Sequence, residues 1–479
     1  MSKDPSAYIV RIHQIVFGLG LLLVGLSTVQ GLMYGSRSNI MLLASVIIGT
    51  TVVLALGKRY WILFPLLTAS GFKVPGLPFD AAELGCIAVI GAYFVRTSVR
   101  RDETIRHPSI ALVALPFIVW VLIVWMQKPT GMNIFGSETI GGRRYFQIIL
   151  AFLVLNVLSR IRFTEKDCKI VFWGIFLFAT MNILVGRLTS HSFLTGGSEG
   201  ESLTAYVLDS AVTPCLLLLC LYPLRQFLSV SWKSVIVMVF ALGVIASGRR
   251  TNFGKMLIMP FILVMLRRRE TMLTAACAIA GTAVLALVVQ GQGRLYELPV
   301  PAQRALSTLL PGKWDRRLAG YGKKDPFRAE MIAAAKRQIR SSPWFGTGGY
   351  AIDRRELIWA AQASKEIHAG HIVGRNWHNK WYGMAADFGI PLSLAWGLFA
   401  VTAALYTLRH TRQTWRGGYV NALLLYYASF MFNDLIFAFG DAANSPFYQW
   451  PCFAMVIGLA RVSEQEAYQD DIQGTGQSI

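Results

Sequence analysis

A histidine lies where the longest polar stretch of the chain gives way to apolar sequence. His378 stands within the segment RNWHN (375–379), and an apolar run begins at Trp381. A histidine is largely neutral near pH 7 and can take a proton from a hydroxyl group. His378 is therefore a candidate general base, with Arg375 and Asn379 as possible supporting groups. The alternative interpretation is an interfacial histidine between two tryptophans that takes no part in a reaction.

Two adjacent arginines, Arg249 and Arg250, occupy a short turn between two apolar runs. A guanidinium group binds phosphate through two parallel hydrogen bonds, so the pair is a candidate anion site. Solvation in an exposed turn is the alternative. Arg328 opens a later basic segment, and its spacing alone does not distinguish it from the cations around it.

Charged residues also occur inside or beside the apolar runs. An ionisable group within a membrane is costly, so it tends to be paired or functional. These residues are Asp209, Lys255, Asp387 and Asp434, with Asp441 in the last loop.

Glu366, His368 and His371 form a loose cluster of possible metal ligands. No fourth ligand accompanies them, and no cysteine pair has the CxxC spacing of a zinc site. A polar surface is the simpler interpretation, and the sequence predicts no catalytic metal and no other cofactor.

Composition places these residues in a membrane protein. Of the 479 residues 54% are hydrophobic and 15% are charged, and the apolar ones form uninterrupted blocks such as Val16–Met33 and Met272–Val289. Blocks of this length span a bilayer as helices, because lipid offers the backbone no hydrogen bonds. The prediction is an all-α polytopic protein of about twelve to fourteen transmembrane helices.

Lys and Arg are distributed unequally between the short loops. With the N-terminus in the cytoplasm, most of them fall on the cytoplasmic side, as the positive-inside rule requires. This orientation predicts four parts: an N-terminal transmembrane bundle (1–290), a periplasmic loop domain (291–377), C-terminal transmembrane helices (378–461) and a cytoplasmic tail (462–479), which we expect to be disordered.

The predicted periplasmic loop is basic, and the formal net charge of the chain is +20. The positive-inside rule does not explain a basic loop on this face, because it places Lys and Arg on the cytoplasmic side. An anionic lipid or a phosphate-bearing substrate explains this better than nucleic acid, because the loop lacks a platform of basic and aromatic residues. Phe327, Met331, Ala335 and Ile339 share one helical face, which predicts an amphipathic helix lying flat on the membrane surface. A second candidate helix is Arg354–Ile367.

Taken in order, these residues resemble the O-antigen ligase and polymerase superfamily. Phe327-Arg328 precedes the segment SPWFGTGG (342–349), which is similar to the family's arginine followed by Pro, an apolar residue and Phe-Gly-x-Gly. His378-Asn379 and then Gly389 follow its spaced His-Asn and glycine pattern. The second glycine of the ligase pattern is replaced by Leu392, a departure that weakens the ligase assignment against a polymerase.

The resemblance implies a role for each matching residue. His378 would be the catalytic base, and Arg328 with Arg250 or Arg249 would bind pyrophosphate. Asp434 or Asp441 would stand for the late acidic residue of the family.

The resemblance also implies a GT-C-like fold and a reaction. A glycan would move from undecaprenyl pyrophosphate to lipid A–core on the periplasmic face of the bacterial inner membrane, without metal and with inversion. A polysaccharide polymerase, which uses a second lipid-linked glycan as acceptor, is the close alternative. A transporter of lipid-linked sugars, which would not be an enzyme, is the third; it commonly shows repeated halves, and none is evident here.

Overall fold

The structure, a computed structural model, is 87% helical, and no strand occurs among the residues that it describes. This confirms the predicted all-α class. The described residues are 55–70, 81–100, 109–127, 143–190, 211–229, 231–246, 250–267, 271–307, 313–314, 326–348, 377, 379–414, 418–436 and 449–476.

The helices fall into three groups along the chain. The first group comprises η1 (Gly57–Ile62), α3 (Leu63–Ser70), α4 (Ala81–Arg100), η2 (Ser109–Ala114), α5 (Leu115–Gln127), α6 (Arg143–Leu158) and α7 (Glu165–Ser190). The second comprises α9 (Val212–Leu221), η3 (Leu224–Phe227), α10 (Trp232–Ala246), α11 (Arg250–Arg267), α12 (Thr271–Gly291), α13 (Val300–Leu306) and α15 (Pro326–Ser341). The third comprises α18 (Lys380–Phe388), α19 (Ile390–Thr414), α20 (Gly418–Ile436) and α21 (Gln449–Gly476).

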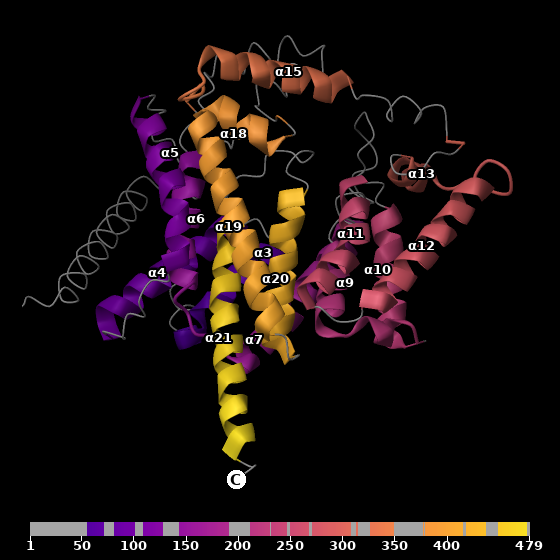
Figure 1. Cartoon of the computed structure of the whole chain (residues 1–479), viewed down its shortest axis with the longest axis horizontal. Coiled ribbons are helices and arrows are strands. Elements are labelled where there is room, and N and C mark those ends of the chain that lie inside the picture. Colours follow the sequence, from indigo (N-terminus) through magenta and orange to yellow (C-terminus); the bar gives the residue numbers. More distant parts are fainter. Residues whose placement is uncertain are drawn as a thin grey trace, which may run out of the picture.

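Most of these helices run up and down a single bundle (Figure 1). We call the end that carries α15 and α18 the loop end, and the end where α21 finishes the tail end. Helix α6 reaches from one end to the other. Tyr145 in its first turn bonds to Gly348 at the loop end, and Ser159, just after its last residue, bonds to Arg461 at the tail end.

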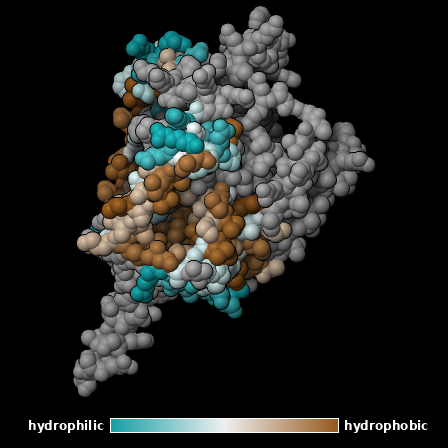
Figure 2. Space-filling view, turned by 90° about the vertical axis from the view of Figure 1, so that its right-hand side faces the viewer, coloured by the Kyte–Doolittle hydropathy of each residue, from teal (hydrophilic) through white to brown (hydrophobic). Residues whose placement is uncertain are grey.

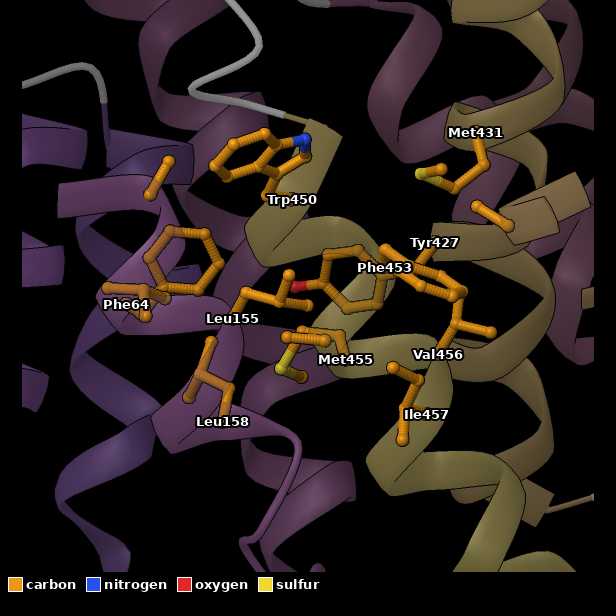
Figure 3. Packing of buried hydrophobic residues seen from close by; sticks show 14 of the residues in the cluster. Phe64, Leu155, Leu158, Tyr427, Met431, Trp450, Phe453, Met455, Val456 and Ile457 are labelled. Atoms are coloured by element: carbon orange, nitrogen blue, oxygen red, sulfur yellow. The ribbon is translucent and has the colours of Figure 1, made fainter. Parts of the chain in front are cut away.

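Helix α21 forms the centre of the hydrophobic core. Trp450, Phe453 and Val456 are fully buried, and Figure 3 shows the core side chains of α21 between Phe64 and Leu155 on one side and those of α20 on the other. Interlocking side chains are how helices associate in lipid, where burial from water supplies little driving force.

Three described helices are long and apolar enough to cross a membrane: Ile110–Gln127, Thr271–Gly291 and Ile390–Thr411. Much of their surface is exposed and apolar, as with Met272 and Ile279 of α12. Figure 2 shows an apolar band on the side of the molecule that carries α10 and α12, with hydrophilic patches on either side of it. Such a band is unfavourable in water and is typical of a lipid-facing surface. The predicted span Val16–Met33 lies outside the described residues.

Several basic side chains lie at the tail end. Arg59 pairs with Asp167 at 2.7 Å, Lys233 lies 3.8 Å from the centre of the Tyr222 ring, and Arg461 donates to the Ser159 carbonyl. This agrees with the charge asymmetry used for the orientation, in which the tail end is cytoplasmic; the orientation itself stays a prediction.

The C-terminal tail differs from the expectation of disorder. Helix α21 continues without a break to Gly476. Its polar part is anchored where it leaves the bundle, since His410 bonds to the Glu464 carboxylate and Ser463 donates to Asn421. Anchored first turns and the helix-favouring residues Glu, Gln and Ala that follow allow the helix to extend past the apolar core.

The predicted amphipathic helix exists as α15, but it does not lie with its apolar face on the membrane. Met331, Ala334 and Ala335 are buried against Trp377 and Ala386. The helix therefore crosses the loop end on top of α18 (Figure 1). The apolar face of α15 therefore packs on protein and not on lipid as predicted. The second candidate helix, 354–367, lies outside the described residues.

Candidate functional site

Helix α18 begins at Lys380, two residues after position 378, and Asn379 is its N-cap. The Asn379 side-chain oxygen accepts a hydrogen bond of 3.1 Å from the Tyr382 backbone N–H, and the residue is buried. Such an N-cap stabilises a helix by about 1 kcal/mol. The amide of Asn379 thus holds the helix that follows position 378.

Trp377 fixes the chain on the other side of position 378. Its indole is buried against α15 and lies close above Gly383, where a Cβ would come within 3.0 Å of the ring. Its Nε1–H donates to the Asp387 carboxylate, 3.3 Å away. Asp387 is also buried. A charge within an apolar run needs a partner, and the Trp377 indole is that partner.

The Pro-Trp-Phe-Gly turn packs directly on the junction between α18 and α19. Thr347 N–H donates to the Ala386 carbonyl at 3.0 Å, and Gly348 N–H donates to the Asp387 carbonyl at 3.1 Å. In return, Ile390 N–H donates to the Pro343 carbonyl at 2.8 Å. Segments some forty residues apart in sequence are therefore joined through their backbones.

Glycine is required where these two segments meet. Gly389 has φ +90°, and a Cβ there would lie 1.8 Å from the Trp344 carbonyl oxygen. Gly346 has φ +61°, and its Cβ would lie 2.5 Å from the Asp387 carbonyl carbon. Both the left-handed backbone and the close approach exclude a side chain. This explains physically two glycines of the recognised motif.

Two helices of the bundle hold the joined segments from below. The Trp120 indole of α5 stacks on Phe345, with ring centres 5.6 Å apart, and donates to the Phe388 carbonyl at 2.9 Å. The Tyr145 hydroxyl of α6 donates to the Gly348 carbonyl at 2.8 Å. We call these joined segments, 342–348, 377 and 379–389 with α15 across them, the motif frame.

Sequence reasoning missed a buried polar pair close to the frame. Gln147, two residues after Tyr145, donates to the Glu83 carboxylate at 2.7 Å, and both side chains are buried. Lys380 was missed as well, and it is 2% exposed. A charged residue adjoining an apolar run was the available signal in both cases.

Several predicted site residues have no described side chain. His378, Arg249, Arg375 and Asp441 lie outside the described residues. For three others only the backbone is described: Arg250 is the first residue of α11, Arg328 lies in the first turn of α15, and Asp434 lies in the last turn of α20.

The start of α11 lies at the same end of the bundle as the motif frame (Figure 1). Phe253, one turn after Arg250, is buried in a cluster with Leu306 of α13 and Trp314. Gln292 and Gln303 bond to the backbone of Leu298, which ties the first part of the long loop together. The loop therefore returns over the start of α11, while α15 covers α18.

Residues 234–397 match the family model described as O-Antigen ligase. This region is similar to the O-antigen ligase family. It runs from α10 into α19 and contains the arginine turn, α15 and the whole motif frame. No curated protein matches the chain.

The domain match supports the resemblance found in the sequence, and with the apolar helices it supports a membrane glycosyltransferase of the O-antigen ligase or polymerase type. The matched region keeps its motif frame rigid through backbone hydrogen bonds, an N-cap and a buried carboxylate. Rigid support is what a group-transfer site needs, because small misplacements of a reacting group are costly.

Proposed function

We propose that the protein transfers a glycan from undecaprenyl pyrophosphate to lipid A–core, as an O-antigen ligase. The observation that carries the proposal is the motif frame. It joins three separate parts of the matched region around position 378, between the buried residues Trp377 and Asn379. Helices α11 and α15, whose first turns contain Arg250 and Arg328, begin at this same end of the molecule.

The proposed reaction is a direct displacement. An acceptor hydroxyl attacks the anomeric carbon of the donor sugar, a new glycosidic C–O bond forms, and the bond from that carbon to the pyrophosphate oxygen breaks. His378 takes the hydroxyl proton, and undecaprenyl pyrophosphate leaves with the bonding electrons. Attack opposite the leaving group inverts the anomeric centre.

The arginines act on the leaving group in this scheme. The departing pyrophosphate gains negative charge, which Arg250 and Arg328 would stabilise, with Arg249 as the alternative to Arg250. Pre-placed positive groups at a partly dry site contribute several kcal/mol to such steps. Pyrophosphate is already a good leaving group, so the scheme uses neither nucleotide nor metal.

A polysaccharide polymerase is the second candidate. Leu392, fully buried in α19, stands where the ligase pattern has its second glycine. A polymerase would use the same base and leaving group, with a second lipid-linked glycan as acceptor.

One experiment tests the proposal. The purified protein in liposomes receives lipid-linked glycan alone, or together with lipid A–core, and His378→Ala serves as the inactive control. A ligase gives product only with lipid A–core, and EDTA leaves its yield unchanged. Ladders formed from donor alone would establish the polymerase instead. No transfer under either condition would contradict an enzymatic role, and loss of product in EDTA would return Glu366, His368 and His371 to consideration.

A further inference from the structure

Trp344 is an exposed tryptophan on a backbone that is held in place. Its side chain is 66% exposed. The residue before it accepts a hydrogen bond from Ile390, its own carbonyl lies against Gly389, and the ring after it stacks on Trp120. The indole is therefore presented outward at a fixed place, beside the first residue of α19.

A lipid-facing stripe begins directly at that place. Exposed apolar residues of α19 recur with helical spacing on one face: Ile390, Leu394, Leu398, Val401 and Leu405. They belong to the candidate membrane span Ile390–Thr411. At 1.5 Å per residue that span is about 32 Å long, close to the roughly 30 Å of bilayer hydrocarbon. Ile390 therefore marks the edge of the hydrocarbon layer.

Helix α5 gives an independent measure of depth. Trp120 stacks on Phe345 and lies within the candidate span Ile110–Gln127. Its position is seven residues, about 10 Å, before the end of that span. Both measures therefore place the turn that carries Trp344 at the membrane and not above it.

The exposed side of helix α15 is polar, in contrast to the exposed apolar side of α19. Ala333, Arg337 and Arg340 are exposed, on the side of the helix away from the buried Met331 and Ala335. Two exposed arginines mark this side as the one that meets water. The chain thus passes from a water-facing helix, through the Trp344 turn, to a lipid-facing helix.

We propose that Trp344 inserts into the boundary between phospholipid headgroups and acyl chains and anchors the motif frame at that depth. An indole suits this layer, because its ring is apolar while its N–H can bond to a headgroup or to water. The partner is the lipid surface itself, and Trp344 continues the lipid-facing stripe of α19. A glycan stacked on the indole is the competing partner, which the test separates.

The anchor does not depend on the proposed transferase activity. If both hold, the group at position 378 works at headgroup depth. The pyrophosphate of a lipid-linked donor lies at this same depth and does not have to leave it.

Spin labels at two sites measure the depth. The full chain carries Cys277→Ala and Cys452→Ala, which removes the two cysteines that are not buried. Trp344→Cys or Ala333→Cys is added, labelled and reconstituted in liposomes of phosphatidylethanolamine and phosphatidylglycerol. Leu398→Cys, within the stripe, provides the deep reference. Collision with oxygen reports lipid, and collision with a water-soluble nickel chelate reports water.

The label at position 344 should collide more with oxygen than with the nickel chelate, at a depth between those of the labels at 398 and 333. The label at 333 should show the reverse preference. Equal exposure of 344 and 333 to water would overturn the proposal. A change in wild-type tryptophan fluorescence on addition of lipid-linked glycan, absent in Trp344→Phe, would assign the indole to the glycan instead.

A second measurement keeps the proposal testable if Trp344→Cys does not fold. Lipids brominated near the headgroup should quench the fluorescence of the wild type more than that of Trp344→Phe. Equal quenching of the two proteins would contradict the anchor.

Discussion

At the scale of single residues, the proposed transfer requires arginines that bind pyrophosphate as planar forks and not only as charges. Arg250→Lys and Arg328→Lys should each lower transfer about tenfold or more, because a lost charge-assisted hydrogen bond costs roughly 1.5–3 kcal/mol. Arg337→Lys is the matched control, since Arg337 is exposed on the outer side of α15 and should tolerate lysine. Initial rates at saturating acceptor measure the effect. Normal rates in both test variants would mean that pyrophosphate is bound elsewhere.

Asp387 and Trp377 are expected to position the segment that carries His378. Asp387→Asn keeps an oxygen that can accept the indole N–H, so it should retain most of the activity. Asp387→Leu and Trp377→Phe each break the bond seen at 3.3 Å and should lower kcat with little change in donor KM.

A double-mutant cycle checks this assignment. If the pair acts as one unit, Asp387→Leu combined with Trp377→Phe should lose little more than the worse single variant. Thermal unfolding in detergent provides the control for general destabilisation. An Asp387→Asn enzyme as inactive as Asp387→Leu would show that the negative charge matters and the hydrogen bond does not.

At the scale of elements, the junction between the Pro-Trp-Phe-Gly turn and α19 has no room for a methyl group. Gly389→Ala should destabilise the protein by at least roughly 1–3 kcal/mol, the cost of a strained backbone, and should abolish transfer. Gly281→Ala in α12 is the control, because nothing lies within 4 Å of the place that a Cβ would take there and alanine favours a helix. Thermal melting of the two variants compares them, and equal melting temperatures would contradict the described packing.

The same junction shows what the sequence can and cannot predict. Periodicity predicts α15, because Met331 and Ala335 recur at helical spacing, but it cannot tell a membrane surface from α18 as the apolar partner. The family pattern identifies Gly389, whereas the reason for it is the Trp344 carbonyl forty-five residues earlier. Asp387 stands out in the sequence as a costly charge, and its partner Trp377 is set by tertiary packing that no local pattern encodes.

The polar end of α21 illustrates the opposite error. Residues after Arg461 lack apolar periodicity, so the sequence predicts disorder. The helix persists because its first polar turns bond through Arg461 to Ser159, just after α6, and through Glu464 and Ser463 to α19 and α20. Anchoring of this kind cannot be inferred from composition.

At the scale of the whole molecule, the distribution of charge predicts an orientation in the membrane. The tail end holds several basic side chains, and the loop end holds α15. Arg337→Cys should therefore react with a membrane-impermeant maleimide added to intact spheroplasts. Ser229→Cys, exposed at the tail end, should react only after permeabilisation. The reverse result would invert the topology and place the proposed site on the cytoplasmic face.

The central claim is that His378 takes the proton of the acceptor hydroxyl. A base role predicts that wild-type transfer falls as the pH drops through about 6.5, the ordinary pKa of histidine, because a protonated imidazole cannot accept a proton. His378→Gln keeps hydrogen bonding without basicity at neutral pH. Near-normal transfer by this variant would leave His378 a positioning role only.

The most direct test is the transfer rate of His378→Ala in liposomes, measured with donor bound at saturation and the fold verified by thermal melting. If His378 is the base, donor binding is retained while transfer falls by at least about 100-fold, the usual contribution of a well-placed general base. A variant that binds donor and transfers glycan at a rate close to that of the wild type would contradict this role.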